Sequence, residues 1–173
     1  MNQKIKISLM LIFVVTGIVI AVIYGTQKEV LPIGSSLPKL KYYSIKDSGY
    51  ISTHGKPLMI MFFKTDCPHC EYELNTMNEK IDVLQAVDFY CVTTDKNYIE
   101  NRLYERWGAL SNSKNYVFAS INENDSMGKI GIKVTPLLLI YNSNGKLIDK
   151  MLGETKFDRL LQSIKKADGA QHQ

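Results

Sequence analysis

A continuous apolar run, Leu58 to Phe63, lies between Pro57 and Lys64 in the first half of the chain. A short run without polar alternation is typical of a strand buried on both faces, as the strands of a parallel sheet are. After it, apolar residues recur at the helical steps of three and four, at Leu74, Met77, Ile81 and Leu84. The sequence therefore predicts a central buried strand that leads into an amphipathic helix.

Strand-like and helix-like segments alternate through the rest of the chain. We expect strands over 87–94, 116–121, 136–141 and 146–152, and helices over 97–107 and from the capping residue Thr155 onward. Turn-forming residues at 142–145 join the last two strands into a hairpin, and a second hairpin is expected over 39–53. This order of elements predicts the α/β fold class.

The composition supports a single domain that folds around a hydrophobic core. Hydrophobic residues make up 45% of the 173 residues and charged residues 22%, a balance that excludes a disordered or fibrous protein. Three cysteines are too few for the disulfide framework of a small secreted scaffold. The net charge of +4 is dispersed among acidic neighbours, so nothing in it indicates a nucleic-acid partner.

An uncharged segment, residues 7–24, follows Lys4 and Lys6. A helix of this length just crosses the roughly 30 Å hydrocarbon layer of a bilayer, and lysines before it favour a cytoplasmic N-terminus. A cleaved secretory signal is the alternative, but residues 21–24 are a poor cleavage site. A buried globular helix would need a one-sided apolar pattern that is missing here.

The chain then divides as follows. We expect residues 1–6 in the cytoplasm, a single-pass signal anchor over 7–24, a linker over 25–38, a domain over 39–167 and a flexible tail over 168–173. The domain would lie on the periplasmic or extracytoplasmic side of the cytoplasmic membrane.

The tetrapeptide Cys67-Pro68-His69-Cys70 stands where the buried strand ends and the helix begins. Two cysteines at this spacing can close a disulfide within one helical turn. Free N–H groups and the helix dipole stabilise a thiolate at a helix N-terminus, so we expect Cys67 to have a lowered pKa and to act as the nucleophile. Pro68 suits the first helical turn, and His69 can add a donor or a positive charge near the thiolate. Cys70 is left as the resolving thiol.

Other uses of the cysteine pair have their own requirements. A structural zinc site needs four ligands, and the remaining cysteine and histidine residues form no second pair, so we expect no metal. A structural disulfide that closes so small a loop would stabilise little. A copper or other metal carrier, or an adaptor that holds client thiols without turnover, stays open. Thiol-disulfide exchange needs no dissociable cofactor, and Cys91 is expected to be a buried structural thiol in the strand 87–94.

Over residues 34–166 the chain resembles the thioredoxin superfamily, and within it the membrane-anchored, exported thiol-disulfide oxidoreductases similar to TlpA and ResA. The resemblance rests on the run from Phe62 to Cys70 and on Val134-Thr135-Pro136 at the start of a later strand. It implies a three-layer α/β/α fold with a central mixed sheet. It also implies a redox-active Cys67–Cys70 disulfide, a cis Pro136 beside it, and backbone pairing of Thr135 with an extended substrate chain.

The resemblance implies that the substrates are exported protein thiols or disulfides, with apocytochrome among the candidates, and that a membrane redox partner exchanges electrons with the domain. The direction of electron flow stays open. The family favours a reductant, whereas His69 chemistry favours an oxidant. A peroxidase would need a Thr-x-x-Cys spacing, and Thr65 is only two positions before Cys67.

The chain departs from the thioredoxin pattern at Met61, where thioredoxins carry a buried acid six positions before the first cysteine. ResA-like proteins place a glutamate six positions after that cysteine, and Glu73 matches this position. Glu73 is therefore a candidate proton acceptor for the resolving thiol, and the alternative is a solvated helix residue. Asp66 would raise the pKa of Cys67 by like-charge repulsion, against the effect of His69.

Overall fold

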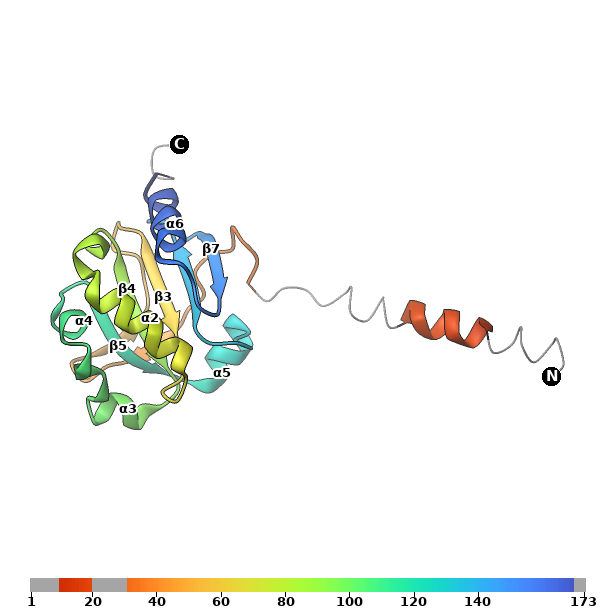
Figure 1. The fold of residues 1–173 in the computed structure, drawn as a ribbon, viewed down its shortest axis with the longest axis horizontal. Coiled ribbons are helices and arrows are strands. Elements are labelled where there is room, and N and C mark those ends of the chain that lie inside the picture. The colour runs from red at the N-terminus through yellow and green to blue at the C-terminus, as the bar shows by residue number, and fades with distance from the viewer. Residues whose placement is uncertain (1–9, 20–30, 170–173) are drawn as a thin grey trace.

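A computed structural model describes residues 10–19 and 31–169 of the chain. Residues 31–169 form one mixed sheet with helices packed on it (Figure 1). The strands are β1 (Lys41–Tyr43), β2 (Ser48–Tyr50), β3 (Leu58–Phe62), β4 (Asp88–Thr93), β5 (Tyr116–Ile121), β6 (Leu137–Tyr141) and β7 (Leu147–Leu152). They lie in the order β2-β1-β5-β4-β3-β6-β7.

The expected central strand is confirmed as β3, in which every residue is buried. It pairs in parallel with β4 and antiparallel with β6, and β4 pairs in parallel with β5. The two expected hairpins are the antiparallel pairs β1–β2 and β6–β7. Three parallel strands thus end at the same edge of the sheet, and β3 leads from there into the cysteine motif.

The longer helices cover one face of the sheet. The helices are α2 (Pro68–Glu79), α3 (Lys96–Glu100), α4 (Gly108–Asn112), α5 (Glu123–Asp125) and α6 (Phe157–Gly169). Leu74 and Met77 of α2, Leu110 of α4, and Leu160 and Ile164 of α6 share one buried cluster. This cluster holds the strand side chains that point toward α2, and Figure 1 shows α2 and α6 in front of the sheet.

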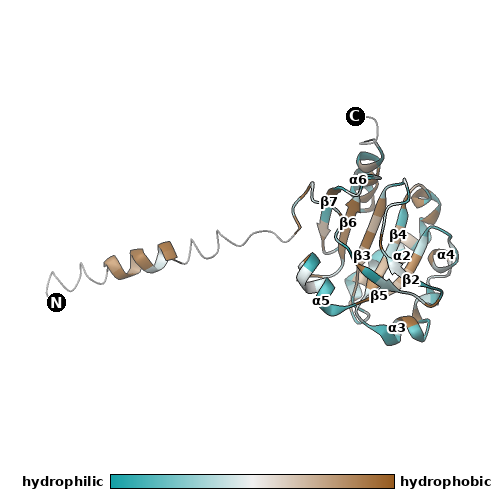
Figure 2. Cartoon of the chain, turned by 180° about the vertical axis from the view of Figure 1, so that it is seen from behind, coloured by the Kyte–Doolittle hydropathy of each residue, from teal (hydrophilic) through white to brown (hydrophobic). Residues whose placement is uncertain are grey.

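The opposite face of the sheet differs from the expected α/β/α arrangement, in which a third layer of helices would cover it. Its buried cluster contains Leu31, Leu40 and Ile51 from irregular chain segments, and Ile130 from the π-helical turn Ser126–Ile130. Among the described residues, α5 and this turn are the helical elements between β5 and β6. Figure 2 shows this face, where the hydrophobic central strands lie behind crossing chain segments. The second covering layer is therefore mostly extended chain.

The helix expected over 97–107 is wrong as a single element. The helix α3 ends at Glu100, and Arg102 adopts a left-handed backbone conformation with φ +54°. A short 3₁₀ helix, Leu103–Arg106, and then α4 follow it. In the same way α2 ends at Glu79, and Ile81–Leu84 form a separate 3₁₀ turn. The apolar residues keep their helical spacing across both breaks, because the segments on either side of each break pack on the same core.

The domain begins before the expected boundary at residue 39. Leu31 is buried, Gly34 N–H donates to the Leu147 carbonyl, and Ser36 bridges to Lys146. Residues 31–38 therefore pack on the domain and are not a free linker. At the other end α6 runs through Gly169, two residues into the expected tail, because its last turn buries Ala167.

Residues 10–19 are helical and predominantly hydrophobic (Figure 2), and their large apolar side chains are exposed. The rest of the expected anchor, 7–9 and 20–24, lies outside the described residues, as do 1–6, 25–30 and 170–173. Within the described ranges, no helix combines the length and apolar character needed to span a bilayer.

Candidate active site

Cys67 is the N-cap of α2, with extended backbone angles and Pro68 in the first helical turn. Its Sγ accepts a hydrogen bond from the Cys70 backbone N–H at 3.3 Å. Partial burial of Cys67 raises its pKa, but hydrogen bonds from Cys70, from Thr135 and from the His69 backbone outweigh burial and leave the pKa lowered. This confirms the expected position of the first sulfur at a helix N-terminus.

Cys70 lies one turn further along α2 and is 1% exposed. Burial raises its pKa, the hydrogen bond with Cys67 adds to the effect, and the value reaches about 12. Both cysteines are free thiols in this structure. The two sulfurs are therefore differentiated, with an accessible acidic thiol at the helix end and a buried thiol that holds its proton.

The loop before β6 contacts the first sulfur. The Thr135–Pro136 peptide bond is cis, as the resemblance implied. The Cys67 thiol donates to the Thr135 carbonyl at 3.7 Å, and Thr135 Oγ1 donates to Cys67 Sγ at 3.9 Å. Two segments that are 68 residues apart in the sequence thus meet at the nucleophile.

His69 is exposed, and its Nδ1 lies 2.5 Å from Oε1 of Glu154. Glu154 belongs to the turn between β7 and α6 and lies 85 residues further along the chain. The sequence analysis did not identify Glu154. No local pattern could have done so, because an exposed glutamate after Gly153 is indistinguishable from an ordinary surface residue.

Glu73 is 2% exposed, so the alternative of a solvated helix residue is wrong. Its Oε1 accepts a hydrogen bond from the Thr155 backbone N–H. Burial raises the pKa of Glu73, the hydrogen bond from Thr155 opposes the rise, and the charge of Glu154 adds to it. Thr155, expected as a helix cap, instead contacts Glu73, and α6 begins two residues later at Phe157.

Of three further residues considered from the sequence, two are buried and one is exposed. Met61 and Cys91 are fully buried in the same core cluster as Cys70, which confirms the apolar character of position 61 and the structural placement of Cys91. Burial raises the pKa of Cys91 well above its ordinary value. Asp66 is exposed, and the net shift of the Cys67 pKa is downward despite this neighbour.

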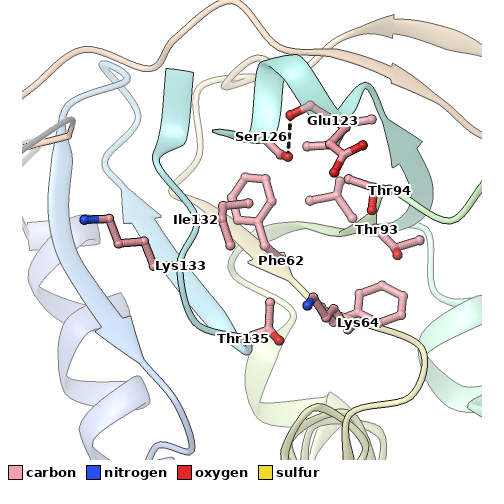
Figure 3. Close-up of a pocket in the computed structure, with 12 residues that line it drawn as sticks. Phe62, Lys64, Thr93, Thr94, Glu123, Ser126, Ile132, Lys133 and Thr135 are labelled. Carbon is pink, nitrogen blue, oxygen red and sulfur yellow. Dashed lines mark hydrogen bonds between the residues drawn. The ribbon is translucent and has the colours of Figure 1, made fainter. Parts of the chain in front are cut away.

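A pocket of about 450 Å³ lies beside the cysteine site, at the carboxyl ends of β3, β4 and β5. Its lining residues include apolar side chains from the strands and polar side chains from the loops that follow them: Phe62, Phe63, Lys64, Val92, Thr93, Thr94, Ile121, Glu123, Ser126, Ile132, Lys133 and Thr135. Figure 3 shows Phe62 and Ile132 near its centre, between Glu123 and Ser126 on one side and Thr135 on the other. Thr135 therefore belongs to both the pocket and the cysteine site.

Among residues 10–19 and 31–169, no three histidine, cysteine, aspartate or glutamate side chains are grouped so that they could hold a metal ion. The reactive groups that the site presents are the two differentiated thiols of Cys67 and Cys70. A dithiol at the N-terminus of a helix, facing a cis-proline loop on a mixed sheet, defines the thiol-disulfide oxidoreductase class of site.

Residues 46–168 match the thioredoxin-like domain family, and the chain belongs to that family. A comparison with curated proteins finds no match.

Solved structures share the fold at low sequence identity. A peroxiredoxin-like protein from Aquifex aeolicus superposes with a TM-score of 0.65 and 19% identity, covering 80% of this chain and 88% of that one. A putative thiol:disulfide interchange protein DsbE from Chlorobium tepidum gives a TM-score of 0.59 and 19% identity, covering 79% of this chain and 98% of that one. StoA from Bacillus subtilis gives a TM-score of 0.57 and 16% identity, covering 75% of this chain and 98% of that one.

Proposed function

We propose that this protein is a membrane-anchored thiol-disulfide oxidoreductase that acts on exported proteins through Cys67 and Cys70. The observation that carries the proposal is the opposite shift of the two thiols. The pKa of Cys67 is lowered at the helix end beside Thr135, whereas the pKa of Cys70 is raised to about 12 in the core. Thiol-disulfide exchange requires one thiolate that attacks the client disulfide and a second thiol that stays protonated until it resolves the mixed disulfide.

In the reducing direction, the Cys67 thiolate attacks one sulfur of a client disulfide. A bond forms between Cys67 and that sulfur, and the other client sulfur leaves as a thiolate that takes up a proton. Cys70 then loses its proton and attacks Cys67 Sγ, which releases the second client sulfur as a thiolate. The client is reduced by two electrons, and the Cys67–Cys70 pair becomes a disulfide. The oxidising direction is the same sequence reversed.

Glu73 is the proton acceptor that we assign to the resolving step. It lies on α2 one turn beyond Cys70, it is buried, and its raised pKa brings its proton affinity closer to that of a thiol. Its carboxylate is held in place by the Thr155 backbone N–H. Pro136 and Thr135 serve as the substrate-binding loop, since Thr135 already touches the nucleophilic sulfur.

The location of the domain is a separate part of the proposal. Residues 7–24 would anchor the chain in the cytoplasmic membrane, with Lys4 and Lys6 inside and the domain on the extracytoplasmic side. Cysteine-reactive reagents that do not cross membranes test this on intact cells. They should label Cys67 of the full chain without lysis, and labelling only after lysis would contradict the proposed topology.

Trapping distinguishes exchange chemistry from metal carriage or client holding. In the Cys70→Ser variant the mixed disulfide with a client cannot be resolved, so mass spectrometry should find client proteins attached to Cys67. The Cys67→Ser variant should trap none, and Cys91→Ala should behave as the parent. An equal yield from both single variants, or binding of one Cu(I) per chain with no mixed disulfide, would contradict the proposal.

The reduction potential of the pair sets the direction of electron flow. A value of about −270 mV or below, as in thioredoxin, would identify an exported reductase that a membrane partner recharges. A value of about −120 mV would identify a disulfide donor. The measurement is a glutathione and dithiothreitol titration of the full chain in detergent, with Cys91→Ala as the control.

A further inference from the structure

Glu154 stands in the turn between β7 and α6, and the residues on either side of it are tied to the active site. The Gly153 backbone N–H donates to the Pro136 carbonyl at 2.8 Å, and the Thr155 backbone N–H donates to the Glu73 carboxylate. Gly153 has φ +76°, a left-handed conformation that favours glycine. The backbone around Glu154 is therefore fixed by the cis-proline loop on one side and by the buried carboxyl group on the other.

The side chain of Glu154 contacts His69 from this fixed position. Its Oε1 lies 2.5 Å from His69 Nδ1, and a carboxylate can only accept a hydrogen bond, so the imidazole is the donor. The two side chains are 45% and 67% exposed, and exposed pairs are usually weak because ordering both side chains costs entropy. Here the fixed backbone on the Glu154 side reduces that cost.

The His69 ring donates to Glu154, and other groups stabilise Cys67. In the part of the chain that the structure describes, the hydrogen bonds to Cys67 Sγ come from the Cys70 N–H and from Thr135 Oγ1. His69 lowers the pKa of Cys67 through its backbone. The sequence predicts that the His69 side chain favours the dithiol form and so makes the pair more oxidising. In the structure, a carboxylate 85 residues further along the chain engages that side chain.

Resting on the proposed function, we propose that Glu154 is a positioning residue that holds the His69 ring in a hydrogen bond away from the Cys67 thiolate, and so keeps the Cys67–Cys70 pair on the reducing side. Loss of the carboxylate frees the imidazole to donate to the thiolate, which stabilises the dithiol relative to the disulfide. The pair then becomes a weaker reductant. Because Glu154 acts through His69, its effect on the pair disappears when the imidazole is absent.

Glu154 has a second electrostatic neighbour in Glu73, whose pKa its charge raises. An effect of Glu154 on the pair through this buried carboxyl group would not need the imidazole of His69. Removing the imidazole therefore separates the two routes, and the test is a double-mutant cycle.

The test measures the equilibrium of the full chain in detergent with glutathione. The Cys67–Cys70 dithiol and one glutathione disulfide give the protein disulfide and two glutathione thiols, so two electrons pass from the protein to glutathione. The parent is compared with Glu154→Gln, His69→Ala and the double variant, at a pH above the midpoint of Cys67 alkylation. Asp158→Asn is the matched control, because it removes an exposed carboxylate four residues further along the chain.

In Glu154→Gln the equilibrium constant for oxidation of the pair should fall about threefold, which is a rise of about 14 mV for a two-electron couple. The midpoint of Cys67 alkylation should fall by about half a pH unit in the same variant. His69→Ala, the double variant and Asp158→Asn should stay within about 1.5-fold of the parent constant.

Two results would overturn the role of Glu154 while the exchange reaction stands: an equilibrium constant in Glu154→Gln that does not fall, or an equal fall in the double variant. The second result would mean that Glu154 does not act through His69. Failure of the parent chain to form a reversible Cys67–Cys70 disulfide with glutathione would instead overturn the proposed function.

Discussion

Cys67 and Cys70 lie one helical turn apart, yet their pKa values shift in opposite directions. The cause is local. Cys67 collects hydrogen bonds at the open end of α2, whereas Cys70 is enclosed by the core cluster that also contains Met61. The same helix thereby makes one sulfur reactive and keeps the other protonated.

Alkylation should reveal this difference directly. With increasing pH, iodoacetamide should modify Cys67 with a midpoint below the value of about 8.5 of an ordinary thiol, because its thiolate is stabilised. Cys70 should stay unmodified until far higher pH. Peptide mapping by mass spectrometry measures both sites in one sample, and modification of Cys70 ahead of Cys67 would contradict the assignment of roles.

Glu73 should make stability depend on pH. Its pKa is raised in the folded state, so the folded protein binds the proton more tightly than the unfolded chain does. The resulting stabilisation is complete below the unfolded value of about 4.3 and is lost as pH rises through the higher folded value. Urea unfolding at pH 4 and pH 7 should show a smaller loss of stability in Glu73→Gln than in the parent.

Glu79→Gln is the matched control for Glu73→Gln, because Glu79 lies on the same helix and is exposed. It should keep the pH dependence of the parent. If Glu73→Gln also kept it, the buried carboxyl would not be the group that titrates.

At the level of elements, α2 organises the segment that follows β4. The Asn78 side chain accepts hydrogen bonds from the Ala109 and Leu110 N–H groups at the start of α4, at 3.0 and 3.2 Å. Asn75 accepts one from Trp107 Nε1 at 2.8 Å. Two asparagines of α2 thus hold Trp107 and the start of α4 against this helix.

Asn78→Ala should therefore destabilise the protein by about 1–2 kcal/mol, since it removes a cap from α4. Urea denaturation followed by circular dichroism gives the value. The neighbouring substitution Glu79→Ala removes an exposed side chain and should cost less than about 0.5 kcal/mol. Equal costs for the two variants would show that α4 does not depend on this contact.

The difference between local sequence signals and contacts made in the fold explains what could be predicted from the sequence. The strands and the nucleophile follow from local signals, such as the apolar run of β3 and the cysteines directly after it. The breaks at Arg102 and Lys80 interrupt the helices without interrupting the apolar spacing, and the partnership of Glu154 with His69 joins segments that are 85 residues apart. No periodicity records them, because an apolar residue after a break can pack on the same core as one before it.

For the whole molecule, the segment 31–38 at the start of the domain is packed on the sheet. The segment 31–38 was expected to be a linker because Pro32, Gly34 and Pro38 are typical of loops. It instead crosses onto the sheet, where Leu31 is buried and Leu37 N–H donates to the Gly145 carbonyl. Composition marks irregular backbone, and it does not say whether that backbone is packed.

A chain that starts at residue 39 should therefore be less stable than one that starts at residue 31. Burial of Leu31 alone accounts for about 2 kcal/mol, and the hydrogen bonds to Gly145 and Leu147 add to it. Thermal unfolding of the two truncated chains measures the difference. Equal melting temperatures would mean that residues 31–38 contribute nothing to the fold.

The pairing of this segment with the start of β7 also affects how the molecules behave toward one another. An exposed edge strand is a template on which a second chain can add, and β7 lies at one end of the sheet. Residues 34–36 occupy the start of that edge through the Gly34 and Ser35 bonds to Leu147 and the bridge from Ser36 to Lys146. At the other end, β2 is only three residues long. The covered start of β7 and the short β2 reduce the unpaired backbone that the sheet presents to another molecule, which disfavours edge-to-edge aggregation.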